Sequence, residues 1–96
     1  MAQIVGLPKL TSAMEEGTLV RWVKKEGDAL EVDDLVAEVE TEKTTMEWRA
    51  LERGVLLKIL VPEGTKLNTN APVAIMGRRG ENITALIKQA KTLKEP

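Results

Sequence analysis

The most informative part of this chain is Leu35-Val-Ala-Glu-Val-Glu-Thr-Glu-Lys-Thr-Thr-Met-Glu-Trp-Arg-Ala50. Apolar and polar residues alternate on both sides of Glu42 and Lys43, which is typical of two strands that each bury one face. With this pair at the centre of a two-residue turn, Val39 faces Met46 and the alternating apolar residues fall on one face of the pair. The pattern predicts a tight β-hairpin that displays Lys43 at its tip.

Glu-Lys is an uncommon pair for the loop of such a hairpin. Two-residue hairpin loops favour Asn-Gly or Asp-Gly, because the usual turns require positive φ angles. A lysine in an exposed turn ordinarily reflects nothing more than the general exposure of charged residues. Whether Lys43 has a function therefore depends on the rest of the chain.

The chain contains an internal repeat with a constant offset of 37 positions, from Gly17 to Gly54. Asp33 matches Asn70 in this alignment, and both residue types tolerate the left-handed conformation. Two copies of one β motif are therefore expected to be related by an approximate two-fold axis. The identities are Gly17/Gly54, Leu19/Leu56, Glu26/Glu63, Gly27/Gly64, Leu30/Leu67, Val36/Val73 and Ala37/Ala74.

The repeat predicts an all-β fold, a flattened β-barrel or sandwich of two four-stranded antiparallel sheets with pseudo-two-fold symmetry (a barrel-sandwich hybrid). Because Lys43 lies in the hairpin that joins the halves, the chain near Ile4 and near Gly77 should meet at the opposite end. Strands are expected at 4–8, from 17, around 30, at 35–40, at 45–50, from 54, around 67 and at 72–76.

The first half is longer than the second between its first two strands. Aligning Ile4 with Met46 gives the first half a five-residue insertion, near Leu10-Thr-Ser-Ala-Met-Glu-Glu16. The second half builds the same motif without it, so folding is expected to tolerate its loss. Loops that the fold does not require often carry recognition.

The C-terminal stretch has a different pattern from the rest of the chain. We expect one β-domain at 1–79, followed at 80–96 by a short amphipathic helix or by the start of an interdomain linker. Asn82 is the expected N-cap and Pro96 lies beyond the expected helix end. The apolar positions at helical spacing are Ile83, Leu86, Ile87, Ala90 and Leu93.

Composition excludes several classes of function. The 96 residues, enough for one domain, include 14 basic and 15 acidic ones, without the basic excess typical of nucleic-acid binding. No apolar run has the length of a membrane span and no segment resembles a secretion signal, so a soluble intracellular protein is expected. The lack of cysteine and histidine predicts no disulfide, no metal site and no catalysis by the chain itself. Four carboxylates are expected to form a solvated acidic surface around the lysine: Glu38, Glu40, Glu42 and Glu47.

Four segments of the chain resemble the lipoyl domain of the dihydrolipoamide acyltransferase of 2-oxo acid dehydrogenase complexes, over Gln3 to Arg79. They are Leu7-Pro-Lys-Leu10, Met14-Glu-Glu-Gly-Thr18, Trp22-Val-Lys-Lys-Glu-Gly-Asp28 and Glu38-Val-Glu-Thr-Glu-Lys-Thr-Thr-Met-Glu47. The family's pattern around its modified lysine, Glu-Thr-Asp/Glu-Lys-Ala/Thr/Val, matches Glu40 to Thr44 without a gap. Biotin carrier domains share the fold but have methionine on both sides of their lysine.

The chain departs from the family's pattern at a few positions. Asp33 and Asn70 stand where the family usually has glycine, and Trp48 where it commonly has an aliphatic residue. Trp22 matches a frequent tryptophan. We assign both indoles to core packing, without an aromatic partner that could help to stack a ligand.

The resemblance implies a function for Lys43. Lipoate would be joined to it as an amide, with Glu42 and Thr44 as flanking turn residues, and would carry acyl groups between active sites. The implied partners are a thiamine-diphosphate-dependent dehydrogenase, the acyltransferase core, dihydrolipoamide dehydrogenase, and a lipoate ligase or lipoyl transferase. The compartment would be the cytoplasm, or the mitochondrial matrix in a eukaryote. The residues expected to be read by the dehydrogenase are Leu10, Thr11, Ser12, Ala13, Met14, Glu15, Glu16 and Glu40.

Three other classes stay open on the sequence. A biotin carrier domain would serve carboxylases. A glycine-cleavage-type lipoyl carrier bears the same cofactor but is longer than this chain. A purely structural β-domain would remain unmodified in the presence of a ligase.

Overall fold

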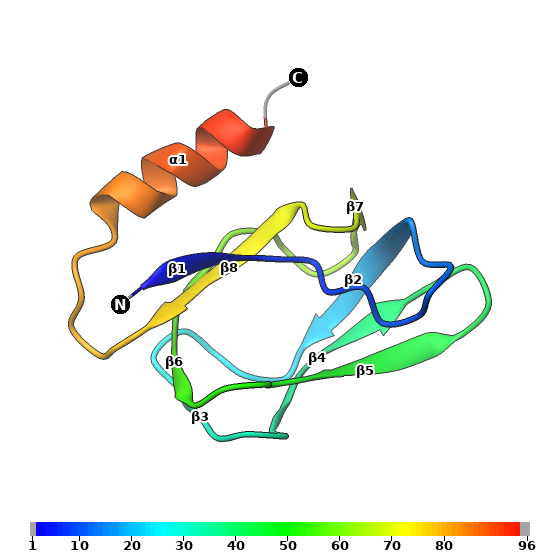
Figure 1. Cartoon of the computed structure of the whole chain (residues 1–96), viewed down its shortest axis with the longest axis horizontal. Coiled ribbons are helices and arrows are strands. Elements are labelled where there is room, and N and C mark those ends of the chain that lie inside the picture. The colour runs from blue at the N-terminus through cyan, green and yellow to red at the C-terminus, as the bar shows by residue number, and fades with distance from the viewer. Residues whose placement is uncertain (1, 95–96) are drawn as a thin grey trace.

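Two four-stranded antiparallel sheets face each other in the computed structural model, which describes residues 2–94, with side chains to position 92 (Figure 1). One sheet has the order β1-β8-β6-β3 and the other β5-β4-β2-β7. The predicted flattened all-β sandwich is thereby confirmed. The elements are β1 (Gln3–Gly6), β2 (Glu16–Trp22), β3 (Ala29–Leu30), β4 (Leu35–Glu40), β5 (Thr45–Arg49), β6 (Gly54–Ile59), β7 (Thr65–Asn68), β8 (Pro72–Gly77) and α1 (Thr84–Lys94).

The two sheets repeat each other strand for strand. Along the two sheet orders, β1 corresponds to β5, β8 to β4, β6 to β2 and β3 to β7. Asp33 and Asn70 both have positive φ angles, 75° and 74°, as their place in the repeat predicts. Gly27 and Gly64 match in the same way, with φ angles of 94° and 88°. These left-handed positions allow each half to make the same turns.

Reciprocal hydrogen bonds hold the two halves together. The N–H of Gly27 donates to the Leu56 carbonyl at 2.7 Å, and the N–H of Gly64 donates to the Leu19 carbonyl at 2.6 Å. The two donors lie 37 positions apart in the sequence, and so do the two acceptors. Because β3 pairs with β6 and β7 pairs with β2, neither half forms a complete sheet alone.

The first strand is shorter than predicted. β1 ends at Gly6, not at Pro8, because its pairing with β8 shifts after Val5. Leu7 instead pairs with the turn before β8: its N–H donates to the Ala71 carbonyl and its carbonyl accepts from the Asn70 N–H, both at 2.9 Å.

The alignment of the first strand with β5 was wrong by one residue. Gln3 faces Met76, and Met46 faces Val39, the repeat equivalent of Met76. Gln3, and not Ile4, is therefore the counterpart of Met46. This makes the inserted segment of the first half six residues long, not five.

The core lies between the sheets and is entirely apolar among the described residues. Leu19, Val39 and Leu56 are fully buried, and each such side chain stabilises the fold by about 1.5–3 kcal/mol. Trp48 is 6% exposed, while Trp22 is half-buried and packs against the core, so the core assignment of both indoles holds.

The two tryptophans contact each other, contrary to the expectation that they lack an aromatic partner. Their ring centroids lie 5.8 Å apart with a tilt of 55°, within the range of favourable aromatic pairs. The indole N–H of Trp22 donates to the Val61 carbonyl at 3.0 Å. Both rings pack against each other and against the core, so they are not available to stack on a ligand.

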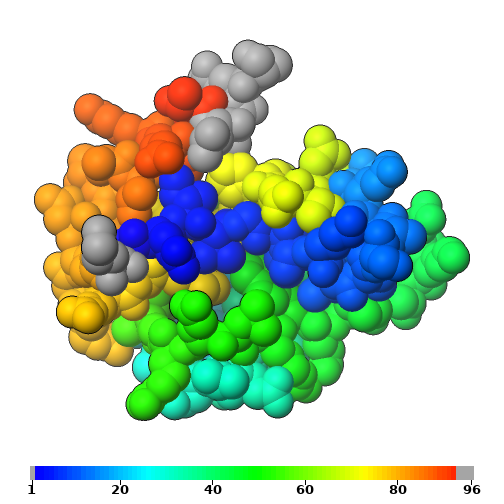
Figure 2. Space-filling view, in the orientation of Figure 1, coloured from blue at the N-terminus to red at the C-terminus, as the bar shows by residue number. Residues whose placement is uncertain are grey.

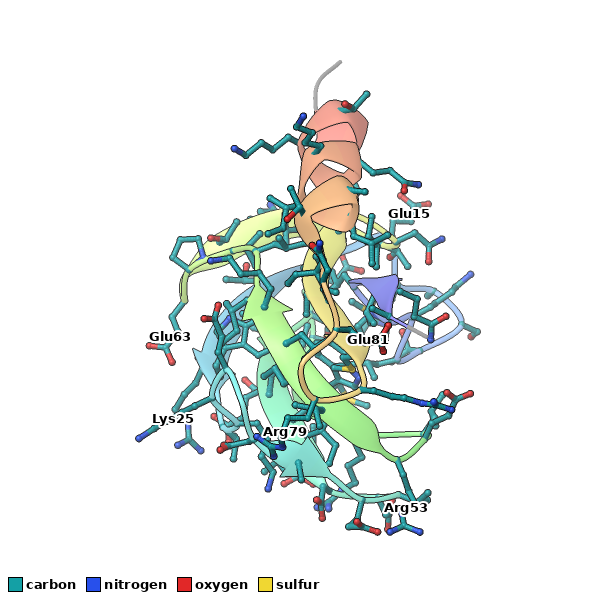
Figure 3. All side chains as sticks on the ribbon, turned by 90° about the vertical axis from the view of Figure 1, so that its left-hand side faces the viewer. Glu15, Lys25, Arg53, Glu63, Arg79 and Glu81 are labelled. Atoms are coloured by element: carbon teal, nitrogen blue, oxygen red, sulfur yellow. The ribbon has the colours of Figure 1, made fainter. Side chains whose placement is uncertain are left out.

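Helix α1 covers the outer face of the β1–β8 sheet (Figures 1 and 3). Asn82 accepts a hydrogen bond from the Thr84 N–H at 3.0 Å and so acts as the predicted N-cap. Ala90 is buried, as predicted from helical spacing, whereas the side chain of Leu93 and all of Pro96 lie outside the described residues. No helix within residues 2–94 is long and apolar enough to cross a membrane.

The outer faces of the two sheets explain why only one carries a helix. Under α1 the strand register places Ile4 beside Ile75, and Ile75 beside Lys58. The equivalent row on the other sheet is Glu47, Glu38 and Arg21. An apolar row needs a cover and a charged row does not, so the asymmetry of the sequence fixes the place of the helix.

Candidate functional site

From its turn as far as Ala37, the hairpin between β4 and β5 has the register predicted from its alternation; the pairing then shifts, and Leu35 faces Arg49. Val39 faces Met46 and Ala37 faces Trp48, and the N–H of Thr41 donates to the Thr44 carbonyl at 2.8 Å. The hairpin projects at one end of the molecule, whereas β1 begins at the other (Figure 1). Gln3 pairs with Met76 there, so the two ends of the strand framework meet far from Lys43, as predicted.

The turn itself is closed by a side chain. Among the described residues only Asp33 and Asn70 combine a side chain with positive φ, so Glu42 and Lys43 do not adopt the turn usual for two-residue loops. The hydroxyl oxygen of Thr41 accepts from the N–H of Thr44 at 3.2 Å and from that of Lys43 at 3.4 Å. The same hydroxyl donates to the Thr44 carbonyl at 2.9 Å. Sequence reasoning missed this role of Thr41.

Lys43 is exposed and makes no ion pair with any residue that the structure describes. Its neighbours Glu40 and Glu42 are exposed and likewise unpaired within that part of the chain. An ammonium group without a salt bridge is available to a modifying enzyme. The flanking residues Glu42 and Thr44, as predicted, lie in the turn on either side of it.

The acidic surface around the lysine is smaller than predicted. Glu38 lies 3.3 Å from the Arg21 guanidinium, and Glu47 lies 2.7 Å from that of Arg49. The hydrogen bond and charge of Glu47 raise the pKa of Arg49 above its ordinary value. Two of the four predicted carboxylates are thus paired with arginines, and of these four only Glu40 and Glu42 are unpaired within the described chain.

A groove of about 760 Å³ separates the hairpin tip from the inserted loop. Residues of the predicted recognition loop from Thr11 to Glu16 line one side, and the turn from Glu40 to Thr44 lines the other. Figure 2 shows the blue loop against the green tip of the hairpin. The structure therefore brings the loop and Lys43 together, although about 30 positions separate them in the sequence. Leu10 lies behind the groove, half-buried against the core.

The inserted loop contributes Met14 to the hydrophobic core. Met14 is only 5% exposed and belongs to the hydrophobic core. Its methyl group lies against Gly17, where a Cβ would be 2.8 Å away. The burial of Met14 argues against the expectation that folding tolerates removal of the whole loop, because removal would empty this buried position. Thr11, Ser12, Ala13, Glu15 and Glu16 are exposed.

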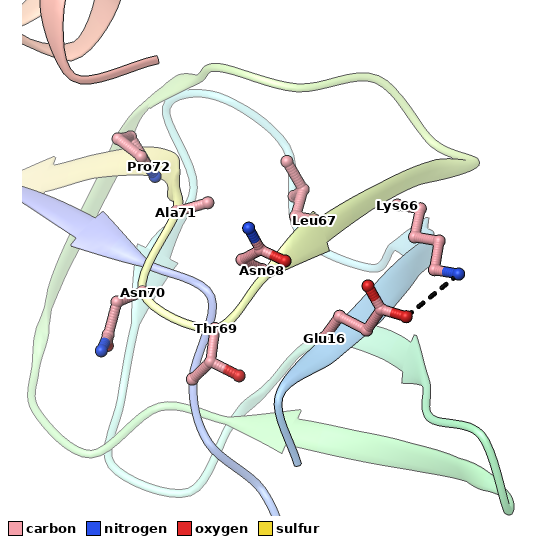
Figure 4. Close-up of a pocket in the computed structure, with 8 residues that line it drawn as sticks. All are labelled: Glu16, Lys66, Leu67, Asn68, Thr69, Asn70, Ala71 and Pro72. Carbon is pink, nitrogen blue, oxygen red and sulfur yellow. Dashed lines mark ion pairs between the residues drawn. The ribbon is translucent and has the colours of Figure 1, made fainter. Parts of the chain in front are cut away.

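The second half of the chain fixes the shape of the loop. The hydroxyl of Thr69 donates to the Met14 carbonyl at 3.1 Å, and the Thr69 N–H donates to the Glu15 carbonyl at 2.9 Å. Lys66 pairs with Glu16 at 3.1 Å. Figure 4 shows these side chains around a second depression of about 710 Å³, beside β7. Thr69 and Lys66 thus bind the loop on one side, while its exposed side chains line the groove on the other.

The site suits covalent attachment better than catalysis. Within residues 2–94 no three His, Cys, Asp or Glu side chains come close enough to hold a metal ion. The carboxylates near Lys43 are exposed, whereas acid–base catalysis by carboxylates relies on burial to shift their pKa values. The site presents the exposed amine of Lys43 on a turn that the Thr41 side chain closes.

Comparisons with known proteins agree with this reading of the fold. The Biotin_lipoyl family model, described as "Biotin-requiring enzyme", matches residues 3–76. The chain is similar to the lipoyl domain of the 2-oxoglutarate dehydrogenase complex from Azotobacter vinelandii, with a TM-score of 0.62 and 27% identity. That match covers 79% of this chain and 99% of that domain.

Two curated relatives are similar in sequence. The dihydrolipoyllysine-residue acetyltransferase component of the pyruvate dehydrogenase complex of Zymomonas mobilis is 39% identical over 96% of this chain and 21% of its own length. The mitochondrial protein of that name from Saccharomyces cerevisiae is 48% identical over 75% of this chain and 15% of its own length. The chain thus spans about a fifth, or less, of the length of these relatives.

The family match spans most of the described residues and includes every strand up to Met76 in β8, together with the Lys43 hairpin. The chain belongs to the biotin/lipoyl attachment family and is a non-catalytic carrier domain of the lipoyl type.

Proposed function

We propose that Lys43 carries lipoate, joined by an amide bond between its Nζ and the lipoate carboxyl group. The observation that supports this proposal is the exposed, unpaired amine of Lys43 at the hairpin tip, within the run Glu40-Thr41-Glu42-Lys43-Thr44. Glu42 and Thr44 flank the attachment point. The lack of methionine on either side argues against biotin.

The residues present fit such a group. The turn projects away from the sheets, so a long side chain attached there can move without crossing the domain surface (Figure 1). When bound, lipoate supplies a dithiolane that accepts an acyl group and is reduced by the transfer. The protein supplies presentation, and tethering raises the concentration of the arm at each partner's active site.

The domain would serve a 2-oxo acid dehydrogenase complex, with pyruvate as the substrate class named by the relatives. Its partners would be a thiamine-diphosphate-dependent dehydrogenase, an acyltransferase core, dihydrolipoamide dehydrogenase, and a lipoate ligase or lipoyl transferase. The complex would lie in the bacterial cytoplasm or the mitochondrial matrix. The carrier domain would end near position 79, with 80–96 leading to the remainder of a longer chain.

Recognition by the dehydrogenase would use the outer rim of the groove. Its exposed loop residues are Thr11, Ser12, Ala13, Glu15 and Glu16, and Glu40 faces them from the hairpin. The groove carries four carboxylates against Lys43 and Lys66, and amide formation would remove one of the two positive charges. A basic partner surface would therefore approach the modified domain faster than the unmodified one. Leu10 and Met14 act as anchors of the loop.

The test is modification by purified enzymes. With lipoate, ATP and a lipoate ligase, the mass of the intact parent should rise by lipoate less one water. Lys43→Arg should abolish the gain, because the guanidinium cannot form this amide, whereas Lys66→Arg on the same groove should not. A biotin ligase with biotin serves as the second arm. Biotin addition without lipoate addition, or lipoate on Lys43→Arg, would overturn the proposal.

A further inference from the structure

We infer that Thr41 is a positioning residue for the modification of Lys43, an inference that rests on the proposed attachment of lipoate there. The turn has no glycine and no positive φ angle, so its two central residues do not match the twist of the flanking strands as the usual hairpin turns do. An interaction other than the backbone preference of these residues must therefore stabilise the turn. The candidate is the Thr41 side chain.

The hydrogen bonds of the turn show how it is held. In a two-residue hairpin loop the residues at both ends normally exchange backbone bonds. Here the N–H of Thr41 reaches the Thr44 carbonyl at 2.8 Å, but the return bond from the Thr44 N–H goes to the Thr41 hydroxyl at 3.2 Å. That hydroxyl also receives the Lys43 N–H at 3.4 Å and donates to the Thr44 carbonyl at 2.9 Å. One oxygen atom thus closes the loop.

The position of Lys43 depends on this oxygen. Apart from the bond between the Thr41 N–H and the Thr44 carbonyl, the exposed turn residues bond only to this hydroxyl among the described residues, and the Lys43 side chain has no ion pair to hold it. Without the hydroxyl, the N–H groups of Lys43 and Thr44 would turn to water and the loop would sample several shapes. A ligase that binds one shape would then find a smaller fraction of the domain in the competent form, which raises its KM and leaves kcat unchanged.

Thr45 offers a matched control one position beyond the turn. It has the same side chain, is exposed, and its hydroxyl makes no hydrogen bond within the described chain. Thr41→Val keeps the shape of the residue and removes the oxygen. Thr41→Ser keeps the hydroxyl, and Thr41→Asn restores an acceptor by a different side chain, since Asn bonds the backbone two residues on.

The experiment measures lipoylation rates of the intact domain against its concentration, with backbone amide exchange by NMR as a second readout. Thr41→Val should raise the KM about fivefold to tenfold, the effect of one lost hydrogen bond, and should speed exchange at Lys43 and Thr44. Thr41→Ser, Thr41→Asn and Thr45→Val should stay within about twofold of the parent.

The outcomes separate this inference from the proposed function. A parent domain that gains no lipoate contradicts the proposed function itself. A parent that is lipoylated, with Thr41→Val at the same KM, overturns the positioning role alone. If Thr41→Val lowers the melting temperature of the domain, the role stands only if Thr41→Asn restores the KM. Equal loss of rate in Thr45→Val would show that any change in the hairpin is harmful and would refute a specific role.

Discussion

Glu63, just before β7, accepts a hydrogen bond at 2.9 Å from the backbone N–H of Trp22, at the end of the neighbouring strand β2. The mirrored bond runs from the N–H of Ile59 to Glu26 at 2.8 Å, and both residues of one pair lie 37 positions from those of the other. Each glutamate precedes the left-handed glycine of its repeat. The Glu-Gly turns are therefore clamps between the halves as well as turns.

The first prediction concerns this clamp. Glu63→Ala should lower the free energy of unfolding by about 0.5–1.5 kcal/mol, because it leaves the Trp22 N–H at the end of β2 without its acceptor. Chemical denaturation measures the change. Glu31→Ala is the control, since its ion pair with Arg53 joins two exposed side chains and should contribute less than about 1 kcal/mol. Equal effects of the two would show that the clamp adds no stability.

Met14 provides a second prediction about stability. Met14→Ala should destabilise the domain by about 2–3 kcal/mol, because the residue is 5% exposed and packs against Gly17. Ala13→Ser, its exposed neighbour, should change the free energy of unfolding by less than about 0.5 kcal/mol. Chemical denaturation of the two variants and the parent measures both changes in the free energy of unfolding. A neutral Met14→Ala would restore the view that the loop is dispensable.

Charge on the groove rim supports a third prediction, about partner recognition. Glu15→Gln combined with Glu40→Gln should slow reductive acylation by the dehydrogenase about threefold to tenfold at low salt, and less at high salt. Both carboxylates line the groove and neither has an ion-pair partner in the described chain. Glu52→Gln, at the exposed β5–β6 turn, should leave the rate unchanged. A salt-independent loss would point to shape and not to charge.

The fourth prediction is a pH dependence at the opposite end of the molecule. Glu81 accepts hydrogen bonds from the Arg78 N–H at 2.6 Å and the Ala2 N–H at 2.7 Å, beneath the start of α1 (Figure 3). These bonds, that from Arg78 first, lower the pKa of its carboxyl below the ordinary value of 4.5.

A lowered folded pKa means that the contribution of Glu81 is complete above about pH 4.5 and is lost as the pH falls through the lower folded value. Melting temperatures of the parent and Glu81→Gln should therefore differ near neutral pH and converge below pH 4.5. The control is Glu52→Gln, whose difference from the parent should not follow this curve. A constant gap down to acid pH would contradict the role of Glu81.

The fifth prediction tests the place of the lysine in the turn. Moving it one residue, by Glu42→Lys with Lys43→Glu or by Thr44→Lys with Lys43→Thr, should lower the rate of lipoylation at least about tenfold, since a ligase distinguishes lysines by the backbone that presents them. Mass spectrometry measures the rate, and circular dichroism checks that the fold is kept. Modification of both variants at the parent rate would mean that the hairpin tip itself is not read.

The local features of this domain could be predicted from its amino-acid sequence. Alternation on both sides of Glu42 and Lys43 predicted the pairs Val39–Met46 and Ala37–Trp48, and the structure has both; beyond Ala37 the pairing shifts, because Val36 and Ala37 are both buried. The repeat offset predicted the left-handed angles of Asp33 and Asn70, because a repeated turn needs a repeated backbone conformation. The N-cap at Asn82 followed from residue type and position alone. Such features depend on neighbours along the chain.

Contacts between residues that are distant in the sequence became visible only in the folded domain. Nothing in the sequence placed Met14 in the core, because its burial depends on Gly17 and on the bonds from Thr69 to the loop. The contact between Trp22 and Trp48 likewise depends on how two separate strands pack. Alternation specifies which face of a strand is buried but not which partner covers it, since that choice is made by the packing of both sheets at once.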